Sequence, residues 1–197
     1  VATANADDTL QLGSTTKMEK LTTTGVAGTA STLTLTTVDA LVASGKTFTI
    51  DVTSLDDDIL TFDGSAEADG TFTIKTDGTG AHIATLGKKN DTYTGTSTGI
   101  DTVVGTGGVN TISTGAGADI ITGGTGVDTI TGGAGADVFT YTAVDQSNSS
   151  NVDSITDWGT GADKLSFIVF DEDASNYEEL LDENTLTSYQ GTWIHIV

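Results

Sequence analysis

The chain has 197 residues, enough for one or two small domains, and its 28 acidic residues against 7 basic ones give a formal net charge of −21 at pH 7. This balance excludes nucleic acid and anionic membrane surfaces as partners, because both require a positive protein surface. The chain has no cysteine, which excludes a disulfide scaffold, and no stretch that is apolar for long enough to be a transmembrane segment.

Residues 1–90 alternate apolar and polar side chains in short runs, which is the periodicity of β-strands. The runs lie at 31–36, 46–52, 58–64, 70–76 and 82–86, with turn residues between them. Such strands predict a β-sandwich or a β-solenoid, and continuity with the repeats that follow favours a solenoid without calcium loops. Segment 36–45 is expected to form a short helix closed by Gly45. Residues 5–13 resemble the end of another repeat, which favours a processed protein or the C-terminal part of a longer one.

Two adjacent nine-residue segments, 123–131 and 132–140, fit the pattern G-G-x-G-x-D-x-U-x, in which U is a large apolar residue. This is the calcium-binding repeat of a parallel β-roll. The frame extends back through 114–122, 105–113 and 96–104 with decreasing fidelity, and 91–94 looks like a repeat end one residue out of phase. The glycines permit tight turns with inward carbonyls, the aspartate adds a charged oxygen, and the last three residues form a strand. The sequence therefore predicts an all-β protein, a parallel β-roll or β-solenoid with calcium-binding nonapeptide loops over 91–140.

One turn of the roll takes two repeats, so loops eighteen residues apart should stack on the same edge. Asp101, Asp119 and Asp137 then form one column, while Asn110 and Asp128 form the other. A calcium ion fits between neighbouring loops of a column, so the candidate sites pair 101 with 119, 119 with 137 and 110 with 128. The expected carbonyl ligands are Gly115, Gly117, Gly124, Gly126, Gly133 and Gly135. The expected apolar line of the roll is Val103, Ile112, Ile121, Ile130 and Phe139.

Residues 141–197 change character and are expected to form a small C-terminal cap, because an exposed end of the roll would be an adhesive edge. Segment 175–184 carries a capping box, Ser175 with Glu178, and predicts a helix with Tyr177, Leu180 and Leu181 on one face. Segment 185–197 predicts a hairpin that turns at Gln190 and Gly191.

The repeats together with segment 153–167 resemble the RTX family of proteins exported by type I secretion. In that family the last repeats are typically followed by D-x-I-x-D-[FW]-x-x-G-x-D-K-[IL]. The matching residues here are Asp153, Ile155, Asp157, Trp158, Gly161, Asp163, Lys164 and Leu165. The apolar C-terminus is also similar to the uncleaved secretion signal of these proteins, and residues 1–90 are similar to the solenoids of RTX adhesins and surface-layer proteins.

This resemblance implies a secreted, extracellular or cell-surface protein that passes unfolded through the type I secretion machinery and folds with calcium after export. It also implies that Asp145 and Asp153 hold a further calcium ion at the end of the roll.

An enzyme is not expected. The two histidines, His82 and His195, form no H-E-x-x-H zinc motif. Segment 95–99 matches the G-x-S-x-G elbow around Ser97, but that motif requires a strand-to-helix turn, and here it falls inside the repeat frame.

Two non-enzymatic functions remain, and a third is set aside. The first is a structural surface protein that self-associates into a calcium-dependent layer or filament, and the alternative is a secretion and folding module of a longer effector such as a protease or lipase. The third, ice binding, needs a flat array of outward threonines. The third loop positions of the repeats, Gly107, Ala116, Thr125 and Ala134, form no such array.

Overall fold

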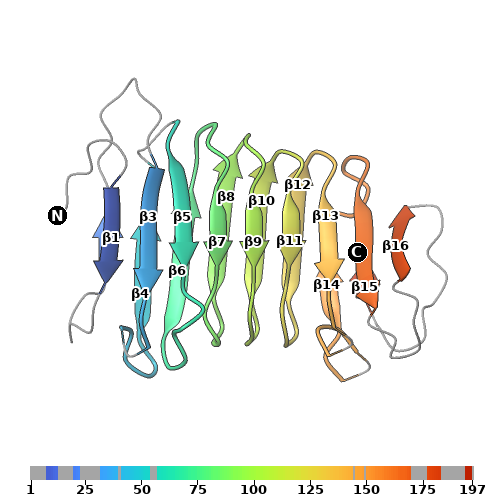
Figure 1. Cartoon of the computed structure of the whole chain (residues 1–197). Helices are drawn as coiled ribbons and strands as arrows, with labels where there is room; N and C mark the ends of the chain where they lie inside the picture. The colour runs from blue at the N-terminus through green and yellow to red at the C-terminus, as the bar shows by residue number, and fades with distance from the viewer. Residues whose placement is uncertain are drawn as a thin grey trace.

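The computed structural model describes residues 8–12, 20–22, 32–39, 41–53, 57–143, 145–148, 150–169, 177–182 and 194–196. In this part of the chain all regular structure is β-strand, and it contains no helix long and apolar enough to cross a membrane. The strands stack along one axis as a solenoid, in which successive strands up to β15 alternate between two sheets (Figure 1).

Sheet A contains nine strands and sheet B contains eight. The order in sheet A is β1 (Asp8–Leu12), β3 (Thr32–Thr37), β5 (Ile59–Asp63), β7 (Ile83–Thr85), β9 (Thr102–Val104), β11 (Ile120–Thr122), β13 (Val138–Tyr141), β15 (Lys164–Val169) and β16 (Tyr177–Asp182). The order in sheet B, from the opposite end, is β17 (Ile194–Ile196), β14 (Asp153–Ile155), β12 (Thr129–Ala134), β10 (Thr111–Ala116), β8 (Thr92–Ser97), β6 (Thr71–Thr76), β4 (Thr47–Asp51) and β2 (Lys20–Thr22). All pairs are parallel except β15 with β16.

The predicted parallel β-roll is confirmed, and its register follows the repeats. Thr111 of β10 pairs with Thr129 of β12, eighteen residues later, as two nonapeptides require. Thr111 pairs on its other side with Thr92, nineteen residues earlier, and a register shift after Ser113 restores the eighteen-residue spacing. The extra residue explains why segment 91–94 is one residue out of phase with the repeat frame.

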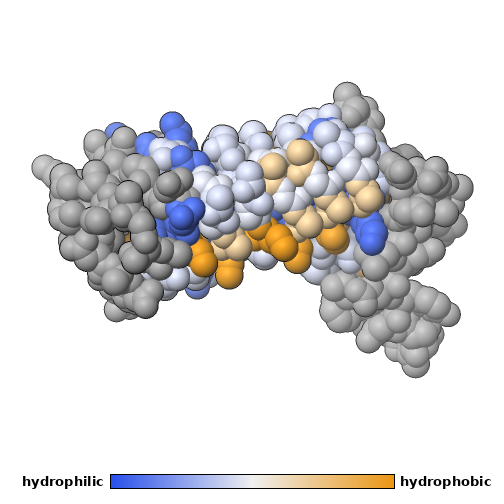
Figure 2. Space-filling model, turned by 90° about the horizontal axis from the view of Figure 1, so that it is seen from above, coloured by the Kyte–Doolittle hydropathy of each residue, from blue (hydrophilic) through white to orange (hydrophobic). Residues whose placement is uncertain are grey.

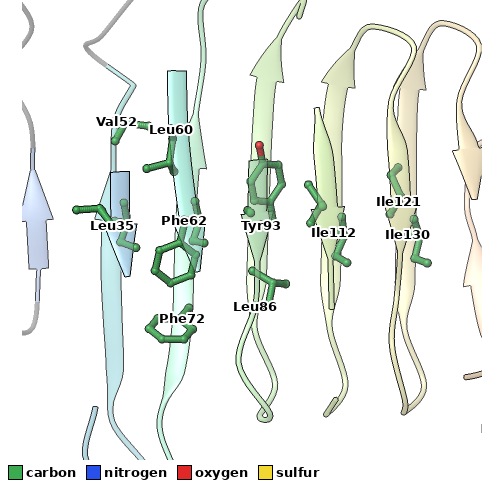
Figure 3. Packing of buried hydrophobic residues seen from close by; sticks show 14 of the residues in the cluster. Leu35, Val52, Leu60, Phe62, Phe72, Leu86, Tyr93, Ile112, Ile121 and Ile130 are labelled. Atoms are coloured by element: carbon green, nitrogen blue, oxygen red, sulfur yellow. The ribbon is translucent and has the colours of Figure 1, made fainter. Parts of the chain in front are cut away.

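The core lies between the two sheets and becomes thinner along the chain (Figure 3). Strands β3 to β6 each contribute two or more buried side chains, including Phe48, Phe62 and Phe72, whose rings pack edge to face. Strands β9 to β12 each contribute one buried large apolar side chain. The expected apolar line of Val103, Ile112, Ile121, Ile130 and Phe139 is fully buried, which confirms it. Each turn of the nonapeptide region therefore buries less apolar surface than a turn before residue 90.

Two expected helices are wrong. Residues 36 and 37 end β3, and the chain then turns, with hydrogen bonds from Leu41 N–H to Val38 O and from Lys46 N–H to Ala43 O. Gly45 is in the left-handed region, with a φ of 71°. Residues 177–182 form β16, because the open edge of β15 offers backbone partners that override the local capping signal. The predicted turn at 190–191 lies outside the described residues, whereas β17 pairs with β14.

The aromatic packing generates a stability prediction. Phe72 contacts both Phe48 and Phe62, so Phe72→Ala removes the centre of this cluster. We expect it to lower the free energy of unfolding in saturating calcium by about 3–5 kcal/mol, measured by urea denaturation. The control is Thr73→Ala, the next residue of the same strand, which faces outward and should change stability by less than about 0.5 kcal/mol. Equal losses in the two variants would contradict this description of the core.

Candidate metal centre

Aspartates at the turns are joined in columns by hydrogen bonds that run from one turn to the next. In the first column, the N–H of each residue donates to the Oδ1 of the column residue in the following turn. The bonds run from His82 to Asp101 (2.9 Å), Asp101 to Asp119 (2.8 Å), Asp119 to Asp137 (2.9 Å) and Asp137 to Asp163 (3.1 Å). Each column residue therefore holds two neighbouring turns in register.

The second column lies on the opposite edge of the roll, because its residues precede strands of sheet B rather than strands of sheet A. Its bonds run from Phe72 to Asp91 (2.6 Å), Asp91 to Asn110 (2.9 Å), Asn110 to Asp128 (2.7 Å) and Asp128 to Asp153 (2.8 Å). The structure thus brings together Asp101, Asp119 and Asp137, and separately Asn110 and Asp128, as the repeat spacing predicts.

In most of these aspartates one carboxylate oxygen accepts a hydrogen bond and the other does not. The second oxygens are buried and accept no hydrogen bond within the described part of the chain; they belong to Asp91, Asp119, Asp128, Asp137 and Asp153. A buried carboxylate oxygen without a donor is costly, and a cation or a proton removes that cost.

Asp101 and Asn110 differ from the five aspartates that have an unused oxygen. The Oδ2 of Asp101 accepts hydrogen bonds from Ser97 Oγ (2.9 Å) and Tyr93 OH (3.1 Å). The side-chain amide of Asn110 donates to the carbonyl oxygens of Gly107 (3.3 Å) and Gly123 (3.1 Å). At these two positions the protein's own groups supply the missing partners. Ser97 is buried within β8 and serves this hydrogen bond, and no helix follows it.

The glycines of the repeats form the rest of each turn. All six predicted carbonyl ligands, Gly115, Gly117, Gly124, Gly126, Gly133 and Gly135, have positive φ values between 94° and 153°. A Cβ at Gly135 would collide with the carbonyl oxygen of Gly117, one turn earlier. A Cβ at Gly132 would collide with the Oδ2 of Asp137. Only glycine lets the loop carbonyls and the orphaned carboxylate oxygens approach this closely.

The donor set fits calcium. Hard oxygen ligands from carboxylates and main-chain carbonyls are what this ion takes, in flexible geometry. No group of three or more His, Cys, Asp or Glu side chains is gathered into a metal cluster in the described ranges. An ion at these turns must therefore draw most of its ligands from loop carbonyls.

The end of the roll adds carboxylates that the repeat pattern does not reveal. Asp163 extends the first column and also accepts from Gly159 N–H (2.8 Å), while Asp157 accepts from the N–H groups of Gly132 and Gly133. Asp153 extends the second column, whereas Asp145 is exposed on the loop after β13. The shared G-x-D order at 135–137 and 161–163 is the signal that identifies Asp163.

Two turns before residue 91 are closed by Glu67 and His82, whose side-chain polar atoms all have hydrogen-bond partners. Glu67 accepts from the N–H groups of Val42 (2.9 Å), Asp69 (3.0 Å) and Gly70 (3.0 Å). His82 occupies the first column in place of an aspartate; its Nδ1 accepts from Leu60 N–H (3.0 Å) and its Nε2 lies 3.1 Å from Asp77 O. The two kinds of turn thus differ in their demand for a further ligand.

Burial dominates the acidity of the orphaned carboxylates. Desolvation raises the pKa of Asp91, Asp128 and Asp137 to about 6 and that of Asp153 to about 7, although a backbone hydrogen bond to each opposes the shift. Neighbouring negative charges, from Asp119 among others, further raise the pKa of Asp137. In the absence of a cation, these groups are thus protonated more readily than exposed aspartates.

Comparison with known proteins gives one match. The family model described as peptidase M10 serralysin C terminal matches residues 87–188, which is about half of the chain. No curated protein and no solved structure is significantly similar to it. The matched region covers both columns from Asp91 to Asp163, and it is the repeat domain of that family rather than its peptidase domain.

The raised pKa values predict that protons replace a cation at these turns. In the folded, metal-free state Asp128 and Asp153 have pKa values of about 6 and 7, above those of the unfolded chain, so the folded state binds more protons between about pH 4 and pH 7. The free energy of unfolding of the metal-free protein should therefore fall as the pH rises through this window. We expect a stronger circular dichroism β signal at about pH 5 than at about pH 8 in calcium-free buffer.

The matched variants are Asp128→Asn, which should weaken this pH dependence, and Asp69→Asn, which removes an exposed charge and should leave it unchanged. A calcium-free protein that is equally folded at both pH values would contradict the interpretation.

Proposed function

The chain belongs to the family of the serralysin C-terminal domain, an RTX-type calcium-binding repeat domain of secreted proteins, and on that basis we propose that residues 91–163 fold by binding calcium at the turns. The observation that carries the proposal is the set of buried carboxylate oxygens without donors. The ion supplies positive charge at these oxygens, and the aspartates and loop carbonyls hold it there.

The five strongest ligand positions, where burial and an unused oxygen coincide, are Asp91, Asp119, Asp128, Asp137 and Asp153. The carbonyls of Gly115, Gly117, Gly133 and Gly135 serve the first column, and those of Gly124 and Gly126 serve the second. Asp101 and Asn110 are weaker ligand candidates than their place in the repeat suggests, because their side chains already form hydrogen bonds with other groups of the protein.

The thin core of the nonapeptide region supports the same mechanism. A fully buried Leu, Ile or Phe side chain contributes about 1.5–3 kcal/mol, and strands β9 to β12 have only one such large side chain each. The aspartate columns also place negative charges close together. Without the ion, weak apolar burial must oppose both chain entropy and charge repulsion. Residues 32–86 have a thicker core, and Glu67 and His82 close two of their turns with paired polar atoms, so they are proposed to be the calcium-independent part of the solenoid.

At the level of the whole protein, we propose that the chain folds outside the cell after passage through a type I secretion system, with which RTX proteins are associated. A fold that depends on calcium forms only where the ion is available, which agrees with folding after export. The match to the C-terminal domain of a peptidase family favours one candidate for the cellular role, the folding module of a longer effector.

A structural role at the cell surface is the other candidate, with calcium-dependent self-association into a layer or filament. A band of apolar residues crosses one side of the solenoid and supports it (Figure 2). Ile83, Ile100 and Ile120 are 48%, 54% and 43% exposed, and Ile83 and Ile120 flank Thr102 on the outer face of sheet A. A charge of −21 keeps copies apart until calcium lowers their repulsion.

The first test concerns the ligands. Asp119→Asn keeps an oxygen for the N–H of Asp101 but removes the charge, so we expect calcium affinity in isothermal titration calorimetry to weaken roughly tenfold or more. Asp101→Asn is the matched variant in the same column, and it should have a smaller effect because Ser97 and Tyr93 can turn their hydroxyls toward an amide. Equal losses in the two variants would contradict the assignment of the orphaned oxygens as ligands.

The second test separates the two cellular roles. If the chain forms layers or filaments, sedimentation velocity should show larger species as calcium rises. Replacing both Ile83 and Ile120 by Ser should prevent their formation. The control replaces Val109 and Val127 by Ser; both are about as exposed but lie on the edge of the second column. A wild-type protein that folds with calcium and stays monomeric at high concentration supports the effector-module role instead.

A further inference from the structure

The outer face of sheet B carries two rows of hydroxyl side chains. Four consecutive strands, β8, β10, β12 and β14, place a Thr or Ser at the first outward position and another at the next one. We call these eight residues the hydroxyl face: Thr92, Thr94, Thr111, Ser113, Thr129, Thr131, Ser154 and Thr156. None of them is charged, in a chain that has 28 acidic residues, so the acidic surface is interrupted here.

The rows are regular because the strands are parallel and paired in register. Thr92 pairs with Thr111, Thr111 with Thr129, and Thr129 with Ser154. Neighbours across the strands therefore lie about 4.8 Å apart, and neighbours along one strand about 6.6 Å apart. Six of the eight side chains are β-branched threonines, which restricts their rotamers and fixes the directions of their hydroxyls.

Most of these hydroxyls are open to solvent. Thr131 and Thr156 share a hydrogen bond of 2.7 Å, and Thr156 also donates to Ile130 O. The other six have no side-chain hydrogen bond to the described part of the chain, and all eight side chains are exposed or half-buried. Water must therefore satisfy them, and it does so at regularly spaced oxygen positions.

We propose that the hydroxyl face binds ice. The two repeat distances of the face are close to those that separate water oxygens on planes of the ice crystal, so water bound to the hydroxyls can be continuous with that lattice. The threonine methyl groups lie between the hydroxyls and do not compete for this water. A charged side chain would orient water around itself, and the eight positions contain none.

The outer face of sheet A is a natural comparison, because the same repeats build it. Its outward positions in one row are Ile83, Thr102, Ile120, Val138 and Lys164. Isoleucine, valine and lysine interrupt the hydroxyls of this row. The second row of sheet A contains Val104 among its hydroxyl residues, and its Thr122 and Ser166 are buried, so only sheet B has two uninterrupted rows of accessible hydroxyls among the strands as described. The third loop positions of the repeats, which carry no such array, lie at the turns and not on this face.

The experiment uses the full chain in saturating calcium and measures its partition into a slowly growing ice front. We expect wild-type protein to concentrate in the ice, with serum albumin as the reference for a protein that ice excludes. Thr111→Lys places a charge in the middle of the hydroxyl face, and we expect roughly tenfold less protein in the ice. Thr102→Lys is the matched control on sheet A, since both residues follow a column residue, and it should partition like wild type.

Circular dichroism is used to check that each variant retains its calcium-induced β signal. If Thr111→Lys does not fold, Thr94→Lys replaces it, because Thr94 lies farther from the columns. Wild-type protein that ice excludes as it does albumin would overturn the proposal. So would equal losses from the lysines on the two sheets.

Discussion

The structure depends on one interaction, the hydrogen bond from a backbone N–H to the carboxylate of the column residue one turn later. It holds neighbouring turns in register, across 18 residues between Asp101 and Asp119 and across 26 residues between Asp137 and Asp163. It also buries the carboxylate against glycine-lined loops. The column bond supplies a donor to one of the two carboxylate oxygens. The second oxygen is buried without a donor, and a cation can offset the cost of burying it.

The solenoid has two parts, which differ in the side chains at their turns and in the thickness of their core. Before residue 90, Glu67 and His82 occupy turn positions with every polar atom paired, and large aromatic side chains fill the core. After it, aspartates replace them and the core narrows to single residues such as Ile112 and Ile121. One continuous pair of sheets thus joins a part stabilised by apolar burial to a part whose turns contain buried carboxylate oxygens without hydrogen-bond donors. The aromatic contacts of Trp158 with Phe139 and of Tyr141 with Phe167 restore apolar packing at the far end.

The nonapeptide frame alone predicts the roll, its apolar line and the two columns, since period and position follow from the repeat. It misses Asp91 and Asp163 because the spacing becomes irregular there; Asp163 lies 26 residues after Asp137. It also treats Asn110 as a ligand, because only the fold shows its amide between two carbonyls. The helix expected at 175–184 fails because a strand edge provides a stronger partner than a capping box. The hydroxyl face follows from residues visible in the sequence, but recognising it requires the register between strands.

The columns also give the solenoid a polarity. Every bond in them runs the same way, with the donor in the earlier turn and the acceptor in the later one. The two directions along the axis of the solenoid are therefore not equivalent. A second copy whose columns ran in the same direction along this axis would have to join head to tail. Contacts of this kind are heterologous and extend into open filaments, whereas a symmetric pair would have to form through the outer faces of the sheets.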